Sequence, residues 1–395
     1  MKKIALVTSS LMMGGLEGVV FNLGKRFIAH GFDVEIVETL KEGEWKPYFL
    51  ENQFKVVSFT KKPLRTAIRH ANQIGDYLKK FDIILLNEAP YAQSVIGKLP
   101  PNVRIYPILH LNLQSIAYNA AGNIGQWNKI IAVSPFLKTY ILKEIDWVRE
   151  TDVIIIPNGI DTREFTPINK KANTKQKIIY LGRLCEEKGV LLLPEIISKL
   201  KDDSLVEKLD VYGSGPMEKA LKDKIDDLNL NNKIFLGGAI PHDQVKDIFG
   251  NYDIIIMPSY KEGLPIVLLE AMACGLIPIV SRIEGCTDIV VKHNVNGYLC
   301  EPGNTDQFAT TLQIALKSDS LSAMSIEARK TIEDEYSISH MAESYLNLFE
   351  NLESSPCIRN HRLDKTLLGD LPYLPYILVR PVRKALRIMG LWTKN

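Results

Sequence analysis

Short runs of apolar, mostly β-branched residues recur along the chain, and segments whose apolar positions have helical spacing separate them. The runs are continuous and do not alternate with polar residues, which is typical of parallel strands covered by helices on both faces. The pattern therefore predicts a parallel α/β architecture. In the first half, strands are expected at residues 4–8, 33–38, 82–87, 104–110, 129–134 and 153–159.

The same pattern begins again in the second half of the chain. The segment between the two series, residues 158–176, is rich in Asn, Thr, Pro and Lys and is interpreted as an interdomain linker. The sequence predicts two doubly wound, Rossmann-like α/β domains, residues 1–165 and 166–335, that face each other across a cleft. In the second series, strands are expected at residues 177–184, 208–213, 233–238, 252–259 and 276–281.

Composition narrows the class of protein. The 395 residues are 46% hydrophobic and 24% charged, which suits a soluble protein with two cores, and the net charge of +2 argues against a dedicated nucleic-acid binder. The five cysteines form no CxxC pair, so reduced thiols in a cytoplasmic protein are expected, without a zinc site. No stretch reaches the roughly 18–20 apolar residues of a membrane span. The apolar run after Lys3 is better explained by a strand than by a signal peptide.

The segment EGLPIVLLEAMACG, residues 262–275, carries two glutamates in an otherwise apolar sequence. Pro265 suits the first turn of a helix that ends at Gly275, so Glu262 is expected in the preceding loop and Glu270 inside the helix. Helix starts bind anions through free N–H groups, and carboxylates beside a phosphate accept hydrogen bonds from sugar hydroxyls. These features favour a nucleotide-sugar site. The alternative is a solvated Glu262 and a Glu270 held in an internal ion pair.

A second candidate region, YLGRLCEEKGV at residues 180–190, follows the first strand of the second half. Arg183 and Lys188 stand in a loop with Gly182, where two cations are able to neutralise a diphosphate; an ordinary charged surface loop is the alternative. The chain contains no Asp-x-Asp motif, so no metal cofactor is expected. Cationic side chains and a helix dipole would then stabilise a departing diphosphate.

The first half offers two further candidates. Gly14 and Gly15 separate the first strand from a helix expected at residues 15–30, but their spacing is not GxGxxG and gives little support for dinucleotide binding. The glycine pair either lets the backbone approach a phosphate or sugar or makes a tight turn. His110 ends a strand at the mouth of the predicted cleft, where it either contacts a ligand or serves the structure.

Taken in their order along the chain, these motifs resemble a known family. The glycine pair, His110, PNGID, GRLCEEKGV, YGSGP and EGLPIVLLEAMACG together are similar to the retaining glycosyltransferases of family 4, which have the GT-B fold. The resemblance covers about residues 1–350. The chain departs from the usual family pattern at Leu16-Glu17-Gly18, where Ala-Glu-Arg is common, and at Asp288, where Glu is common.

The resemblance implies a role for each matching residue. Arg183 and Lys188 hold the donor diphosphate, Glu262 contacts hydroxyls of the donor sugar, and Glu270 binds the ribose. His110 lies beside the transferred sugar and steadies charge at the reaction centre, and no general base is assigned. The remaining implied contacts to donor or acceptor come from Gly14, Gly15, Gly182, Gly263, Leu264, Pro265 and Asp288.

The resemblance implies a metal-independent, cytoplasmic enzyme that moves a sugar, with retention, from a nucleotide-sugar donor to an acceptor. The acceptor is expected to be a glycan or a lipid-linked molecule, and the setting bacterial surface polysaccharide biosynthesis, lipopolysaccharide included. Nucleic acid is not an expected partner. Two alternatives remain at this point: a GT-B epimerase or phosphorylase, and a catalytically inactive homologue that binds nucleotide.

The end of the chain has a different composition. A family-like helix within residues 336–355 is expected to cross back to the first domain, which leaves residues 356–395 as a tail. Residues 357–395 hold 8 Lys+Arg and 2 Asp+Glu, a net charge of +6. After Pro381, apolar residues repeat with helical spacing for about two turns, and basic residues and Trp392 accompany them. This basic amphipathic segment, residues 376–392, favours peripheral attachment to an anionic membrane; packing on the first domain is the alternative.

Overall fold

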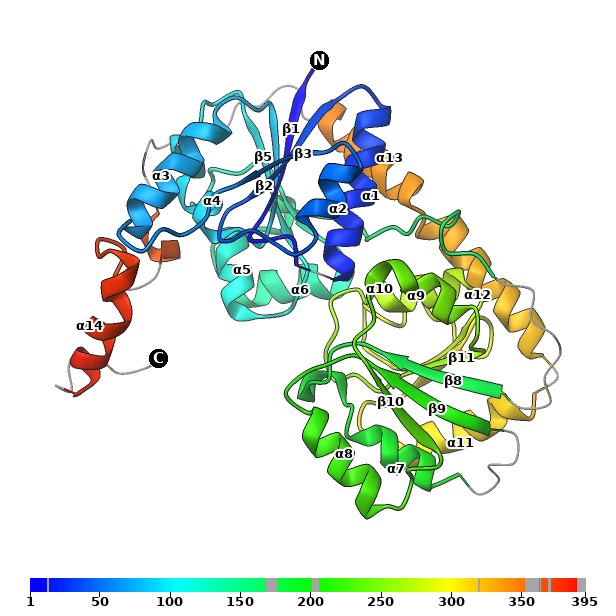
Figure 1. Ribbon diagram of the computed structural model, residues 1–395. Helices are drawn as coiled ribbons and strands as arrows, with labels where there is room; N and C mark the ends of the chain where they lie inside the picture. Colours follow the sequence, from blue (N-terminus) through cyan, green and yellow to red (C-terminus); the bar gives the residue numbers. More distant parts are fainter. Residues whose placement is uncertain are drawn as a thin grey trace.

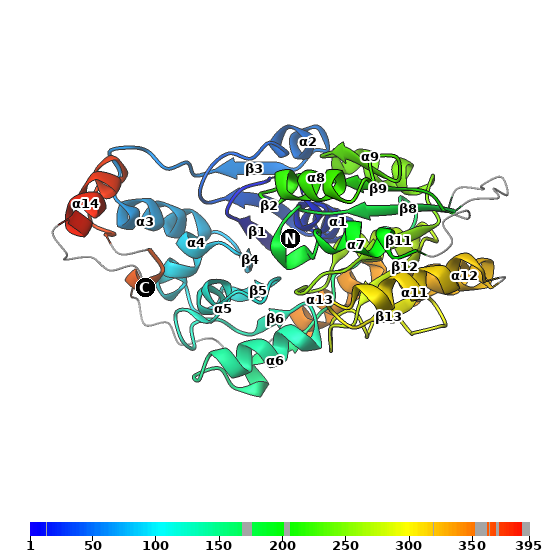
Figure 2. The same ribbon diagram turned by 90° about the horizontal axis from the view of Figure 1, so that it is seen from below.

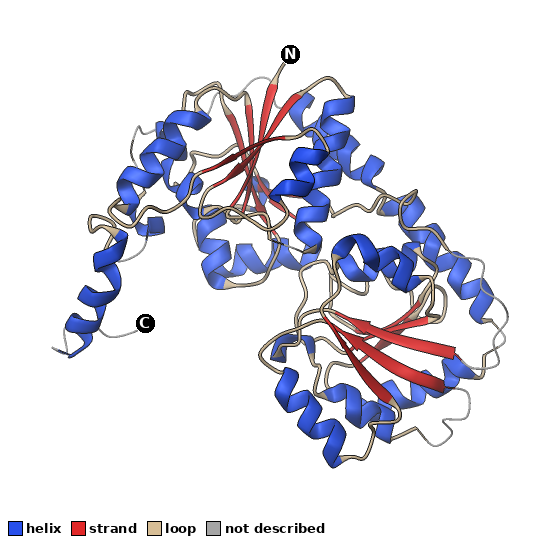
Figure 3. Ribbon diagram, viewed as in Figure 1, coloured by secondary structure: helices blue, strands red, loops and turns tan. Residues whose placement is uncertain are grey.

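Two parallel sheets, each covered by helices on both faces, form the two halves of the computed structural model (Figures 1 and 3). The structure describes residues 1–12, 14–167, 176–200, 206–318, 320–351, 362, 364–368 and 371–388. The expected architecture of two doubly wound α/β domains is confirmed.

The first sheet has the strand order β3-β2-β1-β4-β5-β6-β7 and is parallel throughout. The six strands expected in this half are all present. β3 was not predicted, because its four residues are half-buried or exposed and lack the apolar run of a central strand. The strands are β1 (Lys3–Thr8), β2 (Asp33–Glu38), β3 (Lys55–Ser58), β4 (Ile83–Asn87), β5 (Arg104–Leu109), β6 (Ile130–Ala132) and β7 (Val153–Ile155).

Helices connect these strands and cover the sheet. The first of them ends as its sequence predicts, because Gly31 follows it with φ +83°, a left-handed conformation that favours glycine. The helices of this half are α1 (Gly15–Ala29), α2 (Lys46–Glu51), α3 (Ala67–Leu78), α4 (Pro90–Val95), α5 (Gln114–Ala121) and α6 (Pro135–Glu144), with short 3₁₀ turns η1 (Ile96–Lys98) and η2 (Glu150–Asp152).

The second sheet has the order β10-β9-β8-β11-β12-β13. Its strands are β8 (Gln176–Leu181), β9 (Val206–Tyr212), β10 (Ile234–Gly238), β11 (Ile254–Met257), β12 (Ile277–Ser281) and β13 (Tyr298–Cys300), of which only the three-residue β13 was not expected. The helices are η3 (Glu186–Lys188), α7 (Leu192–Ser198), α8 (Glu218–Asp227), α9 (His242–Phe249), α10 (Ile266–Ala273), α11 (Thr305–Leu316) and α12 (Leu321–Glu335).

Both sheets reverse their strand order at one place, between β1 and β4 in the first and between β8 and β11 in the second. Loops that leave such a switch point diverge to opposite faces of the sheet and open a crevice at the carboxyl ends of the strands, where α/β proteins bind ligands. The loops after β1, β4, β8 and β11 are therefore the first places to look for a site. They contain most of the candidate residues.

The helix α13 (Ile338–Asn351) leaves the second domain and packs against α1 of the first (Figure 1). Phe349 near its end lies among aromatic rings of the first domain, with centroid distances of 5.6 Å to Phe27, 6.3 Å to Phe32 and 5.7 Å to Tyr106. Burial of these rings ties the two halves together at a second place besides the linker.

The described part of the linker is not a free loop. Ile160 N–H donates to the carbonyl of Tyr336 at 2.8 Å, and Ile338 N–H returns a bond of 2.8 Å to the carbonyl of Ile160. Phe165 is 2% exposed. Residues 168–175 of the predicted linker lie outside the described residues.

The tail differs from the prediction. After the turn η4 (Lys365–Leu368), the helix α14 (Tyr376–Ile388) begins before Pro381, not after it. Its first residue, Tyr376, meets His70 of α3 at a ring-centroid distance of 6.1 Å, at the outer side of the first domain (Figures 1 and 2). Its start is anchored because the N–H groups of Tyr376 and Ile377 bond to the carbonyls of Arg65 and Pro63 at 3.2 and 2.9 Å, which fixes the first turn ahead of the proline. Trp392 lies outside the described residues. None of the described helices is long and apolar enough to cross a membrane.

Candidate active site

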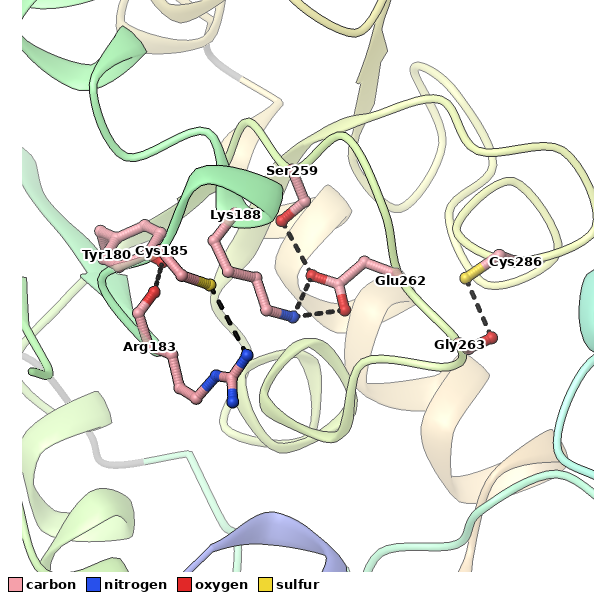
Figure 4. A network of polar contacts seen from close by, with 8 residues as sticks. All are labelled: Tyr180, Arg183, Cys185, Lys188, Ser259, Glu262, Gly263 and Cys286. Atoms are coloured by element: carbon pink, nitrogen blue, oxygen red, sulfur yellow. Dashed lines mark hydrogen bonds and ion pairs between the residues drawn. The ribbon is translucent and has the colours of Figure 1, made fainter. Parts of the chain in front are cut away.

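The second switch point brings Lys188, on η3 after β8, against Glu262, in the loop after β11. Lys188 Nζ lies 2.7 Å from Oε1 and 2.6 Å from Oε2 of Glu262 (Figure 4). Ser259 Oγ donates a further hydrogen bond of 2.8 Å to Oε1. The Glu262 side chain is 3% exposed, and a carboxylate buried to this extent needs such partners. The alternative of a solvated Glu262 is thereby wrong.

Arg183 stands on the same loop as Lys188 but keeps an exposed side chain. The hydroxyl of Tyr180 donates to its carbonyl at 2.9 Å and holds the backbone next to Gly182 (Figure 4). The guanidinium lies 3.8 Å from Cys185 Sγ, a weak contact that leaves its donors available for an anion. Two cations therefore lie at the carboxyl end of β8, one paired and one exposed.

Gly263 follows Glu262 and lies at the boundary between the domains. A Cβ at this position would come within 2.0 Å of the main-chain oxygen of His110, and Ser134 Oγ donates to the Gly263 carbonyl at 2.7 Å. Gly263 was expected to contact the donor or acceptor. In this structure its close neighbour is the backbone of the first domain, at His110. Leu264 is buried, and Pro265, which has no N–H, is the N-cap residue of α10.

Glu270, one turn into α10, is 2% exposed and pairs with a residue that the sequence analysis missed. Its Oε1 accepts a hydrogen bond of 2.8 Å from Nε2 of His242, the first residue of α9. The expected alternative of an internal ion-pair partner is thus realised for one oxygen, whereas Oε2 has no hydrogen-bond partner among the described residues. A histidine at the start of the helix that follows β10 was the only signal for this pair.

In the first domain, His110 directly follows β5 and lies beside Asn87, which ends β4. His110 Nε2 lies 3.0 Å from Asn87 Oδ1, and Asn87 Nδ2 donates to the carbonyl of Val7 at 3.4 Å, which orients the amide. Nε2 is therefore the protonated nitrogen. Burial lowers the pKa of His110 to about 4, so the ring is neutral at physiological pH. It contributes a dipole to the site, not a full charge.

The glycine pair joins the two domains in a similar way. Gly14 is extended at φ −176°, and a Cβ at Gly15 would lie 3.2 Å from the side chain of Ile266 at the start of α10.

The residue two positions further on, Glu17, was not expected in the site. Burial, reinforced by the charge of Glu88, raises the pKa of Glu17 to about 7. Glu88 itself follows β4 with φ +51°, a strained backbone of the kind found at functional sites.

Asp288 shapes a turn next to this region. Its Oδ1 accepts a hydrogen bond of 2.7 Å from the N–H of Gly285, whose carbonyl accepts one of 2.9 Å from Phe136 of the first domain. Between them, Cys286 Sγ donates to the Gly263 carbonyl at 3.1 Å (Figure 4). Asp288 thus belongs to the loop that closes the domains over the site.

No group of three described histidine, cysteine, aspartate or glutamate residues is arranged to hold a metal ion. Metal independence nevertheless stays a prediction. The described cysteines Cys185, Cys274, Cys286 and Cys300 are buried and form no disulfide with one another; Cys357 lies outside the described residues.

Two doubly wound domains, with cations and carboxylates gathered where their switch points meet, define the class of GT-B enzymes. Comparison with known proteins agrees. The model of the glycosyl transferases group 1 family matches residues 161–331, and that of Glycosyltransferase Family 4 matches residues 13–164. The chain therefore belongs to the group 1 glycosyltransferases with the GT-B fold.

Curated relatives carry the same assignment. An uncharacterized glycosyltransferase of Haemophilus influenzae is 24% identical over 87% of this chain and 99% of its own length. A UDP-Gal:alpha-D-GlcNAc-diphosphoundecaprenol alpha-1,3-galactosyltransferase of Escherichia coli is 28% identical over 69% and 76%. A putative colanic acid biosynthesis glycosyltransferase, WcaL, of Escherichia coli K12 is 29% identical over 45% and 46%. The protein is a glycosyltransferase enzyme, with relatives in bacterial polysaccharide biosynthesis.

Among solved structures, Anabaena HepE in complex with UDP and glucose superposes with a TM-score of 0.76. The two chains are 17% identical, and the match covers 89% of this chain and all of HepE. At this identity the likeness establishes the fold.

Proposed function

We propose that the protein transfers a hexosyl or related sugar, with retention of configuration, from a nucleotide-diphosphate sugar to a glycan or lipid-linked acceptor in bacterial surface polysaccharide biosynthesis. The observation that carries the proposal is the Lys188–Glu262 pair at the second switch point, with Arg183 exposed beside it. A cation for a diphosphate and a carboxylate for sugar hydroxyls then lie side by side, with Lys188 Nζ 2.6 Å from Glu262 Oε2, so both can reach one donor molecule.

In this proposal each residue serves one part of the donor. Lys188 uses two N–H groups on Glu262 and has a third for a phosphate oxygen, while Arg183 offers a bidentate fork. The N–H groups at the start of α10 add a further anion site. Glu262 accepts hydrogen bonds from sugar hydroxyls, and Oε2 of Glu270 accepts one from the ribose. The complex of HepE with UDP and glucose supports a UDP-sugar as the first donor to test.

Retention of configuration is proposed because the departing diphosphate can itself serve as the base that deprotonates the acceptor hydroxyl. The acceptor oxygen bonds to the anomeric carbon on the face from which the diphosphate departs, as the bond between that carbon and the phosphate oxygen breaks. The proton of the acceptor hydroxyl passes to a diphosphate oxygen, whose charge Arg183 and Lys188 offset. The neutral His110, whose main-chain oxygen adjoins Gly263, presents no positive charge that would compete for the diphosphate.

Thermal shift against UDP-, GDP- and ADP-sugars, followed by a transfer assay with the best binder, tests the proposal. A ligand at about 100 times its Kd stabilises by about 2.7 kcal/mol. A protein stabilised by none of these donors would not fit the proposal.

The same assay tests metal independence. Because cationic side chains serve in place of a metal, EDTA should leave transfer intact, whereas Arg183→Ala should nearly abolish it. Activity that is lost with EDTA and returns with Mn²⁺ or Mg²⁺ would contradict the diphosphate assignment.

We further propose peripheral attachment to the inner face of the cytoplasmic membrane through α14. The diphosphoundecaprenol acceptor named for the Escherichia coli relative is a lipid, which makes a membrane surface the place where this chain would meet such a substrate. On α14, Ile377 and Leu378 are 56% and 46% exposed, next to an exposed Arg380. Exposed apolar side chains with adjacent cations suit an anionic interface.

A further inference from the structure

His242 connects the two domains at the edge of the active site. It belongs to α9 of the second domain, but its ring lies in a slot made by the first domain and the linker. Trp45 meets it edge-on at a centroid distance of 5.2 Å, and Phe165 does so at 6.2 Å. At Gly18, a Cβ would come within 3.0 Å of ring carbon Cε1. A side chain larger than glycine at position 18 would therefore displace the ring.

The other end of this contact is a carboxylate that is only half satisfied. Glu270 is 2% exposed, and Nε2 of His242 supplies the partner of its Oε1 at 2.8 Å. Oε2 has no hydrogen-bond partner among the described residues, although a buried carboxylate oxygen requires one. A hydroxyl group from a bound ligand would complete this set.

We propose that His242 is a positioning residue for the donor nucleotide: it holds Glu270 in the orientation in which Oε2 accepts the 2′-hydroxyl of the ribose, and it does so when the first domain is seated against its ring. The inference rests on the proposed function, which assigns the ribose to Glu270. His242 then couples donor binding to domain closure. When the first domain moves away, its Gly18 and Trp45 no longer hold the His242 ring, and the ring no longer orients the carboxylate of Glu270.

The charges around His242 make this coupling depend on pH. Burial lowers the pKa of His242, but the hydrogen bond and charge of Glu270, with the charges of Glu164 and Asp243, outweigh it and raise the pKa above its usual value. Glu17 on α1 also faces the ring, and Lys246 on α9 lies 3.6 Å from Glu164. The ring is 18% exposed and adjoins a pocket of about 300 Å³, so it exchanges protons with solvent. The charged pair with Glu270 is present below this raised pKa and is lost as pH rises through it.

Calorimetry with UDP and 2′-deoxy-UDP tests the proposal, with GDP and ADP in parallel to find the best base. His242→Ala should weaken UDP binding about tenfold, because a hydrogen bond to a charged group is lost and Glu270 is no longer oriented. The same substitution should weaken 2′-deoxy-UDP binding less than about threefold, because that ligand lacks the hydroxyl that Glu270 reads. Gly18→Ala should reproduce the effect of His242→Ala.

Two further variants distinguish a positioning role of His242 from a merely structural one. His242→Gln, which keeps a donor but does not titrate, should restore most of the affinity and remove the fall in UDP affinity that is expected of the wild type as pH rises through the raised pKa of His242. His340→Ala, on the exposed face of α13, is the matched control and should change nothing. Equal losses for UDP and 2′-deoxy-UDP, or identical pH profiles for wild type and His242→Gln, would overturn this inference alone. A wild-type protein that binds none of the three nucleotides would overturn the proposed function and this inference with it.

Discussion

The main-chain oxygen of His110 lies so close to Gly263 that a Cβ on the glycine would approach it to 2.0 Å. These residues belong to different domains, and the contact closes the first domain over the loop that carries Glu262. Ser134 donates to the Gly263 carbonyl at 2.7 Å beside it, so the two domains share a hydrogen bond at this point.

Gly263→Ala should therefore impair closure while leaving each domain folded. The methyl group meets backbone, which is unable to move aside as a flexible side chain would, so the domains are held apart. We expect the transfer rate to fall at least about tenfold, with nucleotide affinity within about threefold of wild type. Small-angle scattering with saturating donor should show a larger radius of gyration for the variant. Equal radii with an unchanged rate would show that closure tolerates the methyl group.

Glu262 and Glu270 should divide the donor between them. Glu262→Ala frees Lys188 for the phosphates and removes a sugar contact, so it should weaken a UDP-sugar about 10- to 100-fold and leave UDP almost unaffected. Glu270→Ala should weaken UDP and UDP-sugar alike. Titration calorimetry with both ligands measures the four changes. If Glu262→Ala lowers the affinities for UDP and for UDP-sugar equally, this division of the donor between the two glutamates is wrong.

The pKa of His110 predicts a pH dependence of stability. Burial lowers its pKa from 6.5 to about 4, so the unfolded chain binds more protons between these values and stability increases as pH rises through this window. The shift corresponds to about 3 kcal/mol. His110→Gln should remove that part of the slope between pH 4.5 and 7 in urea denaturation, and His340→Gln, an exposed control, should retain it. A wild-type slope in the His110→Gln protein would contradict a buried neutral ring.

Glu17 predicts the opposite slope. Burial raises its pKa from 4.5 to about 7, so the folded protein binds more protons in this window and stability decreases as pH rises through it. Glu17→Gln removes the cost of a buried charge and should stabilise the protein at pH 8 by about 3 kcal/mol, with little gain at pH 5. The exposed Glu51→Gln is the control. A gain that is the same at both pH values would show that the carboxyl does not titrate in this range.

The chemistry after β8 and β11 was readable from sequence because the parallel-sheet pattern placed Arg183, Lys188 and Glu262 at strand ends, which meet at one edge of the sheet. The pattern did not reveal that Lys188 and Glu262 bond to each other, because pairing across 74 residues depends on side-chain rotamers. Nor did it reveal His242, whose partner is set by how α9 and α10 lie side by side. Gly263 was expected to contact the donor or acceptor, but its neighbour in the structure, the backbone of His110, depends on domain closure, which local sequence does not encode.

The last prediction concerns the tail. The described part of the tail is bonded to the first domain: Asp364 N–H donates to the carbonyl of Ser94 at 2.7 Å, and Ile377 N–H to that of Pro63 at 2.9 Å. Removing the whole tail would therefore disturb the fold as well as any membrane contact, so substitutions on α14 are the sharper test. Ile377→Asp with Leu378→Asp should reduce sedimentation with anionic liposomes, and Arg380→Glu should reduce it further, because each cation near such a surface contributes about 1 kcal/mol.

Ile326→Asp, which alters a 66% exposed side chain on α12, is the matched control and should sediment like the wild type. Added salt should weaken the wild-type interaction, because the electrostatic part is screened within about 8 Å at physiological ionic strength. Unchanged sedimentation of the α14 variants would mean that the helix serves to pack the tail against α3, and that any membrane contact involves another part of the first domain.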